Sequence, residues 1–272
     1  METIPKLEKV QETLLIPLWG RAKISKEPNP ILYDEKAVEI VEKLEYDFSK
    51  INKRFGMFDA FFWSCRAKIL DDEIRLFLTA HPQAIVVNLG TGLETAFHRV
   101  DNSRLRWYDL DLPEVVEIRR KLIPETDRSK CIARSLFDFK WFEEIEEGDG
   151  LLLISGGVLA YFTEKEVKGF FLAATGRFPG AEIVFDAASR LGLIVANRAV
   201  PKSGIRDALH KWSVEDAGVI AKWDPRIEVV SQYPYFKHIR RDKRWGKKYL
   251  MKMWFVDILR IARIFHLRFR KE

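Results

Sequence analysis

A pair of glycines, followed by a pair of carboxylates, gives the strongest indication of chemistry in this sequence. Gly90 and Gly92 lie between an apolar run and a segment with helical spacing, where glycines permit a tight turn and close approach of a ligand to the backbone. Asp109 and Asp111 end the next apolar run, about twenty residues later, where a carboxylate can accept hydrogen bonds from both ribose hydroxyls. Gly-x-Gly by itself also occurs in ordinary turns, but the combination predicts a nucleoside ligand.

Position 95 separates two classes of nucleoside ligand. A nicotinamide dinucleotide fingerprint would have a third glycine where this chain has Thr95, so pyrophosphate at the helix N-terminus is less well supported. S-adenosylmethionine needs instead a partner for its methionine carboxylate, and the guanidinium of Arg66 can supply one. Arg66 can equally form an internal ion pair. A nicotinamide-dependent oxidoreductase therefore remains the alternative to a methyltransferase.

Methyl transfer from a sulfonium is an in-line displacement, so catalysis depends mainly on holding the reacting atoms in line. A hydroxyl acceptor would also benefit from a base, whereas a carboxylate acceptor is already ionised. His210 and Asp186 are candidate bases, and Tyr161 is a candidate hydrogen-bonding partner. Each has a structural alternative, as a packing histidine, a turn cap and a core tyrosine. Trp212 and Trp223 can line an apolar acceptor pocket or belong to the core.

Composition and charge exclude several other classes of protein. Hydrophobic residues make up 47% and charged residues 32% of the chain, which is typical of a globular protein and excludes a disordered one. The two cysteines, Cys65 and Cys131, lie far apart and the five histidines show no metal-ligand spacing, so we expect neither a disulfide nor a metal. The longest uncharged run, 150–163, is too short to span a bilayer. With no apolar stretch at the N-terminus, a cytoplasmic location is expected.

The net charge of +6 is concentrated near the C-terminus. Lysines and arginines there alternate with Trp245, Trp254 and Phe255, a composition compatible with contact to a membrane surface. Basic polar faces are also common without any partner. We therefore expect no nucleic acid, and a small molecule as the partner of the protein.

The elements that must position these residues follow from hydrophobic periodicity. Residues 6–23, 34–47 and 58–80 have apolar residues at helical spacing, and Asp34 is a predicted N-cap, so residues 1–80 form a predicted helical N-terminal cap. The rest, 81–272, alternates short apolar runs with amphipathic segments, which predicts parallel strands joined by crossover helices. The predicted strands are 84–89, 105–108, 129–133, 151–154, 181–185, 227–230 and 264–269.

This order predicts an α/β fold with a Rossmann-like, seven-stranded, mostly parallel sheet and an antiparallel last strand. In 264–269, apolar and polar residues alternate, as in a half-exposed antiparallel strand. An insertion at about 189–224 precedes the sixth strand. Within it, 191–200 is predicted as a helix or loop and 205–223 as two short helices.

Four motifs in the same order resemble the leucine carboxyl methyltransferase superfamily, in its branch named for tetracenomycin polyketide O-methyltransferase. They are the glycine segment 88–97, the stretch 107–115 that contains both aspartates, Gly-Val-Leu-Ala-Tyr-Phe at 157–162, and Phe-Pro-Gly-Ala-Glu-Ile-Val-Phe-Asp at 178–186. The similarity extends from about residue 13 to about residue 234. It implies a class I methyltransferase fold with S-adenosylmethionine as cofactor and S-adenosylhomocysteine as product.

The resemblance also implies roles for individual residues. It assigns Arg66 to the cofactor carboxylate, Gly90 and Gly92 to the methionine part, and Asp111 to the ribose, as a closer match than Asp109. Ser135 and Leu136, after the third strand, would line the adenine, while Asp138 would cap the next helix. Leu112, beside Asp111, is a further candidate for binding the cofactor.

One position departs from the pattern of the family. Members that methylate protein carboxyl termini have a glutamate where this chain has Gly156 at the cofactor site, so a side chain for the cofactor's amino group is missing. We therefore expect an O-methyltransferase acting on a hydroxyl or carboxyl of a small molecule, with aromatic and polyketide-like molecules as the candidate classes. An inactive protein that only binds the cofactor is the remaining alternative.

Overall fold

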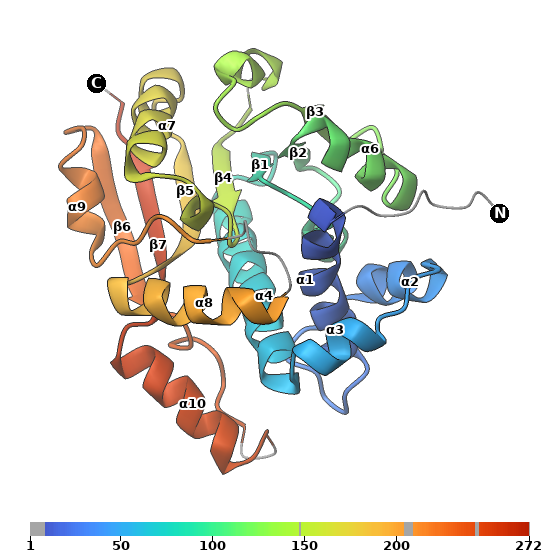
Figure 1. The fold of residues 1–272 in the computed structure, drawn as a ribbon. Coiled ribbons are helices and arrows are strands. Elements are labelled where there is room, and N and C mark those ends of the chain that lie inside the picture. The colour runs from blue at the N-terminus through green and yellow to red at the C-terminus, as the bar shows by residue number, and fades with distance from the viewer. Residues whose placement is uncertain (1–8, 147, 204–208, 243–244, 272) are drawn as a thin grey trace.

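The computed structural model describes residues 9–146, 148–203, 209–242 and 245–271, and contains one seven-stranded sheet (Figure 1). The strand order is β3-β2-β1-β4-β5-β7-β6, and β7 is antiparallel to both of its neighbours while the other pairs are parallel. The predicted α/β class, the seven strands and the antiparallel last strand are confirmed. The strands are β1 Ile85–Leu89, β2 Arg106–Asp111, β3 Ser129–Ala133, β4 Leu151–Ser155, β5 Glu182–Ala188, β6 Ile227–Pro234 and β7 Ala262–Phe269.

The helices fill the connections and extend the chain before the first strand. They are α1 Lys9–Ser25, α2 Glu35–Lys43, α3 Ser49–Arg54, α4 Met57–Ala80, α5 Ala96–Val100, α6 Pro113–Leu122, α7 Glu164–Arg177, α8 Arg190–Ser203, α9 Ala217–Ala221 and α10 Lys247–Ile258, with 3₁₀ turns η1 Phe139–Glu144 and η2 Leu159–Tyr161. Within the described residues, none of them is long and apolar enough to cross a membrane.

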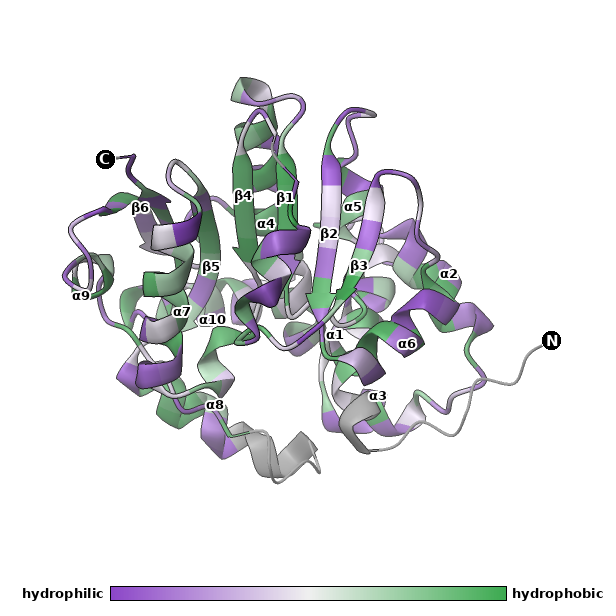
Figure 2. Cartoon of the chain, turned by 90° about the horizontal axis from the view of Figure 1, so that it is seen from above, coloured by the Kyte–Doolittle hydropathy of each residue, from purple (hydrophilic) through white to green (hydrophobic). Residues whose placement is uncertain are grey.

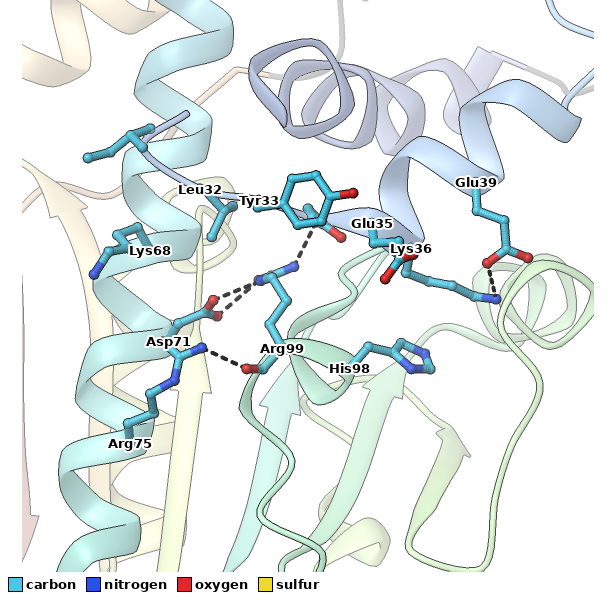
Figure 3. A pocket seen from close by; sticks show the side chains of 12 residues that line it. Leu32, Tyr33, Glu35, Lys36, Glu39, Lys68, Asp71, Arg75, His98 and Arg99 are labelled. Atoms are coloured by element: carbon cyan, nitrogen blue, oxygen red, sulfur yellow. Dashed lines mark hydrogen bonds and ion pairs between the residues drawn. The ribbon is translucent and has the colours of Figure 1, made fainter. Parts of the chain in front are cut away.

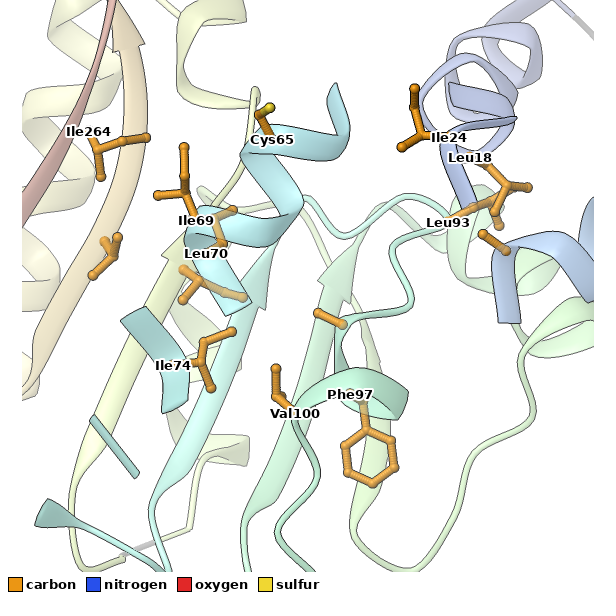
Figure 4. Close-up of a cluster of buried hydrophobic side chains, with 14 of the residues drawn as sticks. Leu18, Ile24, Cys65, Ile69, Leu70, Ile74, Leu93, Phe97, Val100 and Ile264 are labelled. Atoms are coloured by element: carbon orange, nitrogen blue, oxygen red, sulfur yellow. The ribbon is translucent and has the colours of Figure 1, made fainter. Parts of the chain in front are cut away.

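One face of the sheet is covered by the N-terminal helices (Figure 2). Leu70 and Ile74 of α4 belong to the same buried cluster as Val86 and Ile154 of the sheet, and Figure 4 shows both α4 residues over the strands. Helix α1 crosses α4 closely, because a Cβ on Gly20 would lie 3.2 Å from the Cα of Ala60. The predicted N-terminal helices thus share one core with the sheet.

The N-terminus of α2 is fixed as its sequence indicates. The side chain of Asp34 accepts a hydrogen bond from the backbone N–H of Ala37 at 3.0 Å, which confirms the predicted N-cap. The short helix α3 lies within a region for which no helix was predicted.

The second face is covered by η1, α7 and α9. Trp141 of η1, Phe170 and Phe171 of α7 and Ile220 of α9 are fully buried in one cluster with Phe185 of β5. Parallel strands need such crossover elements on both faces, so the carboxyl ends of β1, β2, β4 and β5 emerge at one edge between the layers.

The insertion before β6 differs in part from its prediction. Helix α8 forms where a helix or loop was predicted, but α9 is the one helix that the described residues contain between 209 and 223, so the prediction of two is wrong there; residues 205–208 lie outside the described part. Residues 209–214 are not helical because their N–H groups bind other segments: Lys211 and Trp212 donate to the carbonyl of Ala160, and Val214 to that of Ala188.

Helix α10 was not predicted. It lies in the connection between β6 and β7 and is seen at the lower edge of the molecule in Figure 1, beyond α8. Because β6 runs parallel to β5, this connection leaves the sheet at the same edge as the ends of β1 and β4.

Candidate active site

The glycine turn after β1 has the backbone conformation that its sequence requires. Gly90 and Gly92 have φ of +65° and +51°, in the left-handed region that side chains disfavour. A Cβ on Gly90 would also lie 2.6 Å from a methyl carbon of Val158, in the loop after β4. Glycine at position 90 therefore permits both the turn and the contact between the ends of β1 and β4.

Asp111, at the end of β2, holds this turn and keeps part of its carboxylate accessible. It accepts hydrogen bonds from the backbone N–H groups of Gly92 at 2.7 Å and Leu112 at 2.8 Å. Its residue is half-buried, and burial raises the pKa of its carboxyl despite these two bonds.

Asp109, in contrast, is buried and all its contacts are inside the protein. Its carboxylate is 1% exposed, accepts hydrogen bonds from Thr91 Oγ at 2.6 Å and Asn88 at 3.2 Å, and pairs with Arg119 of α6 at 2.5 Å. Arg119 was missed in the sequence, although its position on the apolar face of α6, beside Val115, is a signal of a buried partner. Of the two predicted ribose ligands, Asp111 is the one with an accessible carboxylate.

Leu112 and the two residues predicted around adenine lie at the same edge. Leu112 is 42% exposed, whereas Leu136 is 7% exposed and packs into the core, with its carbonyl bound by the indole N–H of Trp141. Ser135 is half-buried. Asp138 is the N-cap of η1, where its side chain accepts a hydrogen bond from the backbone N–H of Lys140. The predicted cap is confirmed.

A buried network of ion pairs ties the glycine turn to the N-terminal helices, and the sequence did not predict it. Arg99 of α5 pairs with Asp34 at 2.7 Å, with Asp71 of α4 at 2.7 Å and with Glu94 at 2.8 Å, and Figure 3 shows the contact with Asp71. Arg21 of α1 pairs with Asp34 at 2.8 Å and Glu94 at 3.0 Å. Burial would raise the pKa of Asp34, but Arg99 and Arg21 lower it to about 2.

Thr95 gains a structural explanation from this network. Its hydroxyl, fully buried, donates to Asp34 at 2.6 Å, so the side chain that replaces the third glycine of a dinucleotide fingerprint fastens α5 to α2. A threonine here is therefore part of the framework behind the turn.

Arg66 reaches the same edge from α4. Its Nη1 lies 3.6 Å from a carboxylate oxygen of Asp186, whose other oxygen accepts the backbone N–H of Gly157 at 2.5 Å. Burial opposes the charge of Arg66, but Asp186 raises its pKa, so the guanidinium stays protonated. A Cβ on Gly157 would lie 2.1 Å from Nη1 of Arg66, and one on Gly156 would lie 3.5 Å from its Nε. The two glycines leave the space that Arg66 fills.

Tyr161 and His210, the two predicted catalytic residues, are brought together. Their rings meet edge to face with centroids 4.9 Å apart. His210 Nδ1 is buried and makes no hydrogen bond within the described residues, and the same is true of Ser155 Oγ at the end of β4. Burial lowers the pKa of His210; the charge of Asp186 opposes this change and that of Arg66 adds to it. His210 is therefore a neutral imidazole near the Arg66–Asp186 pair.

Asn197 of α8 holds the segment that carries His210. Its side-chain amide donates to the carbonyl of His210 at 2.9 Å and accepts the backbone N–H of His210 at 2.8 Å. No sequence signal pointed to this residue. Trp212, in contrast, is 3% exposed and packs with Phe185 and Trp223, so the structure places it in the core rather than on an acceptor pocket.

Two cavities lie away from this edge. One of about 810 Å³ is bounded by α2, α4 and α5 and includes Lys68, Asp71 and Arg99 (Figure 3); one of about 370 Å³ lies beside Trp245 and Tyr249. Neither is lined by the predicted site residues. Among the described residues, no group of histidine, cysteine and carboxylate side chains is arranged to hold a metal.

The residues at the edge fit S-adenosylmethionine. Asp111, at the glycine turn, is a carboxylate suited to ribose hydroxyls, and Arg66, which fills the space beside Gly156 and Gly157, is a guanidinium suited to an amino-acid carboxylate. The open sheet with these groups at the carboxyl ends of its strands defines a class I methyltransferase that depends on S-adenosylmethionine.

Comparison with known proteins identifies the family. A sequence model described as leucine carboxyl methyltransferase matches residues 15–173, so the chain belongs to the leucine carboxyl methyltransferase family. It is 33% identical over 187 residues to the tetracenomycin polyketide synthesis O-methyltransferase TcmP of Streptomyces glaucescens, covering 68% of each chain. It is 27% identical over 210 residues to the S-adenosyl-L-methionine-dependent methyltransferase dpfgK of Gibberella zeae, covering 70% of each. This membership decides against a nicotinamide-dependent oxidoreductase.

Solved structures show the same fold at low sequence identity. A putative methyltransferase from Thermobifida fusca superimposes with a TM-score of 0.61 at 14% identity, covering 96% of this chain and 94% of the other. A DUF574 family protein from Streptomyces avermitilis gives 0.62 at 10% identity, covering 95% and 97%.

Proposed function

We propose that this protein transfers a methyl group from S-adenosylmethionine to a hydroxyl oxygen of a small molecule, with His210 as the base. When bound, S-adenosylmethionine would supply a methyl carbon on a sulfonium: the acceptor oxygen would bond to this carbon in line with the carbon–sulfur bond, which would break to leave S-adenosylhomocysteine. The observation that carries the proposal is the pairing of Tyr161 with a neutral, unpartnered His210 beside Arg66 and Asp186.

The cofactor roles follow the accessible groups. Arg66 binds the methionine carboxylate, because its contact with Asp186 is long at 3.6 Å and leaves donors for a second anion. Asp111 binds the ribose hydroxyls, Gly90 and Gly92 leave room for the methionine part, and Gly156 borders it. Leu112, Ser135 and Leu136 lie nearest the adenine.

His210 takes the acceptor's proton at Nδ1. Burial lowers its pKa, so the imidazole is neutral at physiological pH and can receive a proton as the hydroxyl oxygen forms its bond to the methyl carbon. Tyr161, more than a third exposed and with a pKa raised by burial, keeps its hydroxyl protonated and can donate a hydrogen bond to the acceptor oxygen.

A small-molecule acceptor is favoured by two observations. The relative TcmP is named for polyketide synthesis. Gly156 stands where the family resemblance implies a glutamate in members that methylate protein carboxyl termini. A carboxyl acceptor is already ionised and would need no base. Whether methyl transfer depends on His210 therefore distinguishes a hydroxyl acceptor from a carboxyl acceptor.

The test is turnover of methyl-labelled S-adenosylmethionine with a panel of phenols, alcohols and carboxylic acids. We expect transfer to a hydroxyl, and a fall in kcat of about 10²-fold or more for His210→Gln. The matched control is His98→Gln on α5, a histidine whose pKa is also lowered by burial but which lines the cavity away from the edge. Transfer to carboxylic acids that is unaffected by His210→Gln would overturn the proposed base, and absence of transfer to any acceptor would favour a protein that only binds the cofactor.

A further inference from the structure

The outward face of α10 is apolar. Five large hydrophobic side chains on or directly after this helix are between 45% and 56% exposed, at the spacing of one helical stripe: Met251, Trp254, Phe255, Ile258 and Leu259. On the opposite side, Met253 is fully buried against the core. These five residues, the α10 stripe, thus remain about half exposed in the described protein, while the opposite side of the helix packs against the core.

The segment around the α10 stripe is strongly basic. Residues 236–263 contain ten lysines and arginines and two aspartates, so this segment carries more than the whole excess charge of +6. Lys247 and Lys248, at the start of α10, and Arg260, just after its end, are exposed. The acid within the helix, Asp257, is half-buried and bound to the N–H of Phe236 and to Arg241.

Exposed apolar side chains also lie on α8, the helix next to the end of α10. The start of α8 is pressed against the chain just after α10, because a Cβ on Gly192 would lie 1.9 Å from the carbonyl oxygen of Ile261. Leu191, Ile194 and Val195 of α8 are 43% to 50% exposed. Figure 1 shows the two helices at the same end of the molecule, at the edge of the sheet that also carries the candidate active site.

We propose that α10 docks the protein onto an anionic lipid surface, with the α10 stripe at the boundary between headgroups and acyl chains and the flanking lysines on the headgroups. Aromatic and aliphatic residues in a stripe bordered by lysines are the composition of helices that lie in a membrane interface. A second copy of this chain fits less well, because two such basic faces would repel each other. A nucleic acid fits less well because the centre of the stripe offers phosphates no cation. The proposal is independent of methyl transfer.

Flotation of the purified chain with lipid vesicles tests this docking. We expect binding to vesicles of phosphatidylcholine mixed with phosphatidylglycerol, little binding to phosphatidylcholine alone, and weakening by salt. The triple variant Trp254→Ser/Phe255→Ser/Ile258→Ser and the double variant Lys247→Gln/Lys248→Gln should each lower the partition coefficient by about tenfold or more. The matched control is Leu76→Ser, which replaces a residue of α4 that is 65% exposed; it should bind within roughly twofold of the unmodified protein.

Affinity for S-adenosylhomocysteine, measured for every variant, reports whether the fold is retained, since none of these residues lies at the candidate site. Equal binding to neutral and anionic vesicles, or retention of binding by the folded triple variant, would overturn the proposal. Two other results would also overturn the proposal if the unmodified protein does not bind vesicles. One is a dimer in size-exclusion chromatography that the triple variant does not form, and the other is a gel shift of single-stranded RNA that the triple variant does not cause.

Discussion

The two sides of the active-site edge differ in how closely their charged side chains are paired. At the ends of β1 and β2, Asp109, Glu94 and Asp34 are held by three buried arginines, and the turn itself is fastened to Asp111. At the ends of β4 and β5, Ser155 Oγ and His210 Nδ1 are buried without a hydrogen bond in the described structure. The Arg66–Asp186 contact between them is long.

This difference matches what each side has to bind. A rigid, pre-paired cradle loses little freedom when a ligand of fixed shape arrives, so it suits a cofactor. Buried polar atoms without partners are costly unless something binds them. Among the described residues they occur on both sides, at Trp107 Nε1 and Arg119 Nε as well as at Ser155 Oγ and His210 Nδ1, but only the last two lie on the side where the Arg66–Asp186 contact is long. We infer that the β1–β2 side is preorganised and that the β4–β5 side is completed by the acceptor.

The largest effect should come from breaking the network on the preorganised side. Arg99→Met leaves Asp34, Asp71 and Glu94 without a shared partner, and we expect a loss of about 3–5 kcal/mol in the free energy of unfolding by urea. The matched control is Lys68→Met, which breaks the exposed pair with Asp72 and should cost less than about 1 kcal/mol. Similar losses for both variants would contradict a special role of the buried network.

A somewhat smaller effect is expected for the cofactor ligand on the same side. Asp111→Ala should weaken binding of S-adenosylhomocysteine by about 2–4 kcal/mol, because hydrogen bonds to a charged group are lost. Isothermal titration measures this, with Glu114→Ala, an exposed acid of α6, as the control. Unchanged affinity of Asp111→Ala would remove Asp111 from the ribose.

Raising the pH should lower the stability of the protein through a buried histidine between β5 and β7. His266 of β7 contacts Glu182 of β5 at 2.6 Å and Glu73 of α4 at 3.4 Å; burial opposes its charge, but these carboxylates raise its pKa to about 9. The stabilisation is therefore fully present below the unfolded pKa of 6.5 and is lost as the pH rises through 9. We expect a loss of about 2–3 kcal/mol in unfolding free energy across this window. His266→Gln should be less stable at pH 6 and lack this slope; an equal slope in the variant would refute the assignment.

The smallest expected effect concerns the two hydrogen bonds between the side chain of Asn197 and the backbone of His210. Asn197→Ala removes two hydrogen bonds to the backbone of His210 and should lower the free energy of unfolding by about 1 kcal/mol. It should also lower kcat for hydroxyl acceptors and change their pH profile, while affinity for S-adenosylhomocysteine is unchanged. Asn102→Ala, which removes comparable side-chain to backbone bonds in the loop before β2, is the control for stability without an effect on kcat.

Local patterns were sufficient for the sheet and the glycine turn. Strands β1, β2, β4 and β5 coincide with apolar runs whose side chains are mostly buried, and the long connections between strands predict crossovers and parallel pairs. The helix α10 escaped prediction because its hydrophobic residues occupy most of its circumference and leave no clear periodicity. Of the two short helices predicted in 205–223, only α9 forms among residues 209–223, because tertiary hydrogen bonds to Ala160 and Ala188 compete with local ones in 209–214.

Sequence by itself thus determined the fold class, the turn at Gly90 and Gly92, and the approximate place of the carboxylates. Only the tertiary structure decided that Asp109 forms a buried ion pair with Arg119 while Asp111 stays accessible. It also decided that His210 contacts Tyr161, which lies 49 positions earlier in the chain. The physical reason is that periodicity and turn propensity are local properties of the chain. The partner of a buried charge or an imidazole is set by elements distant in sequence that pack around it.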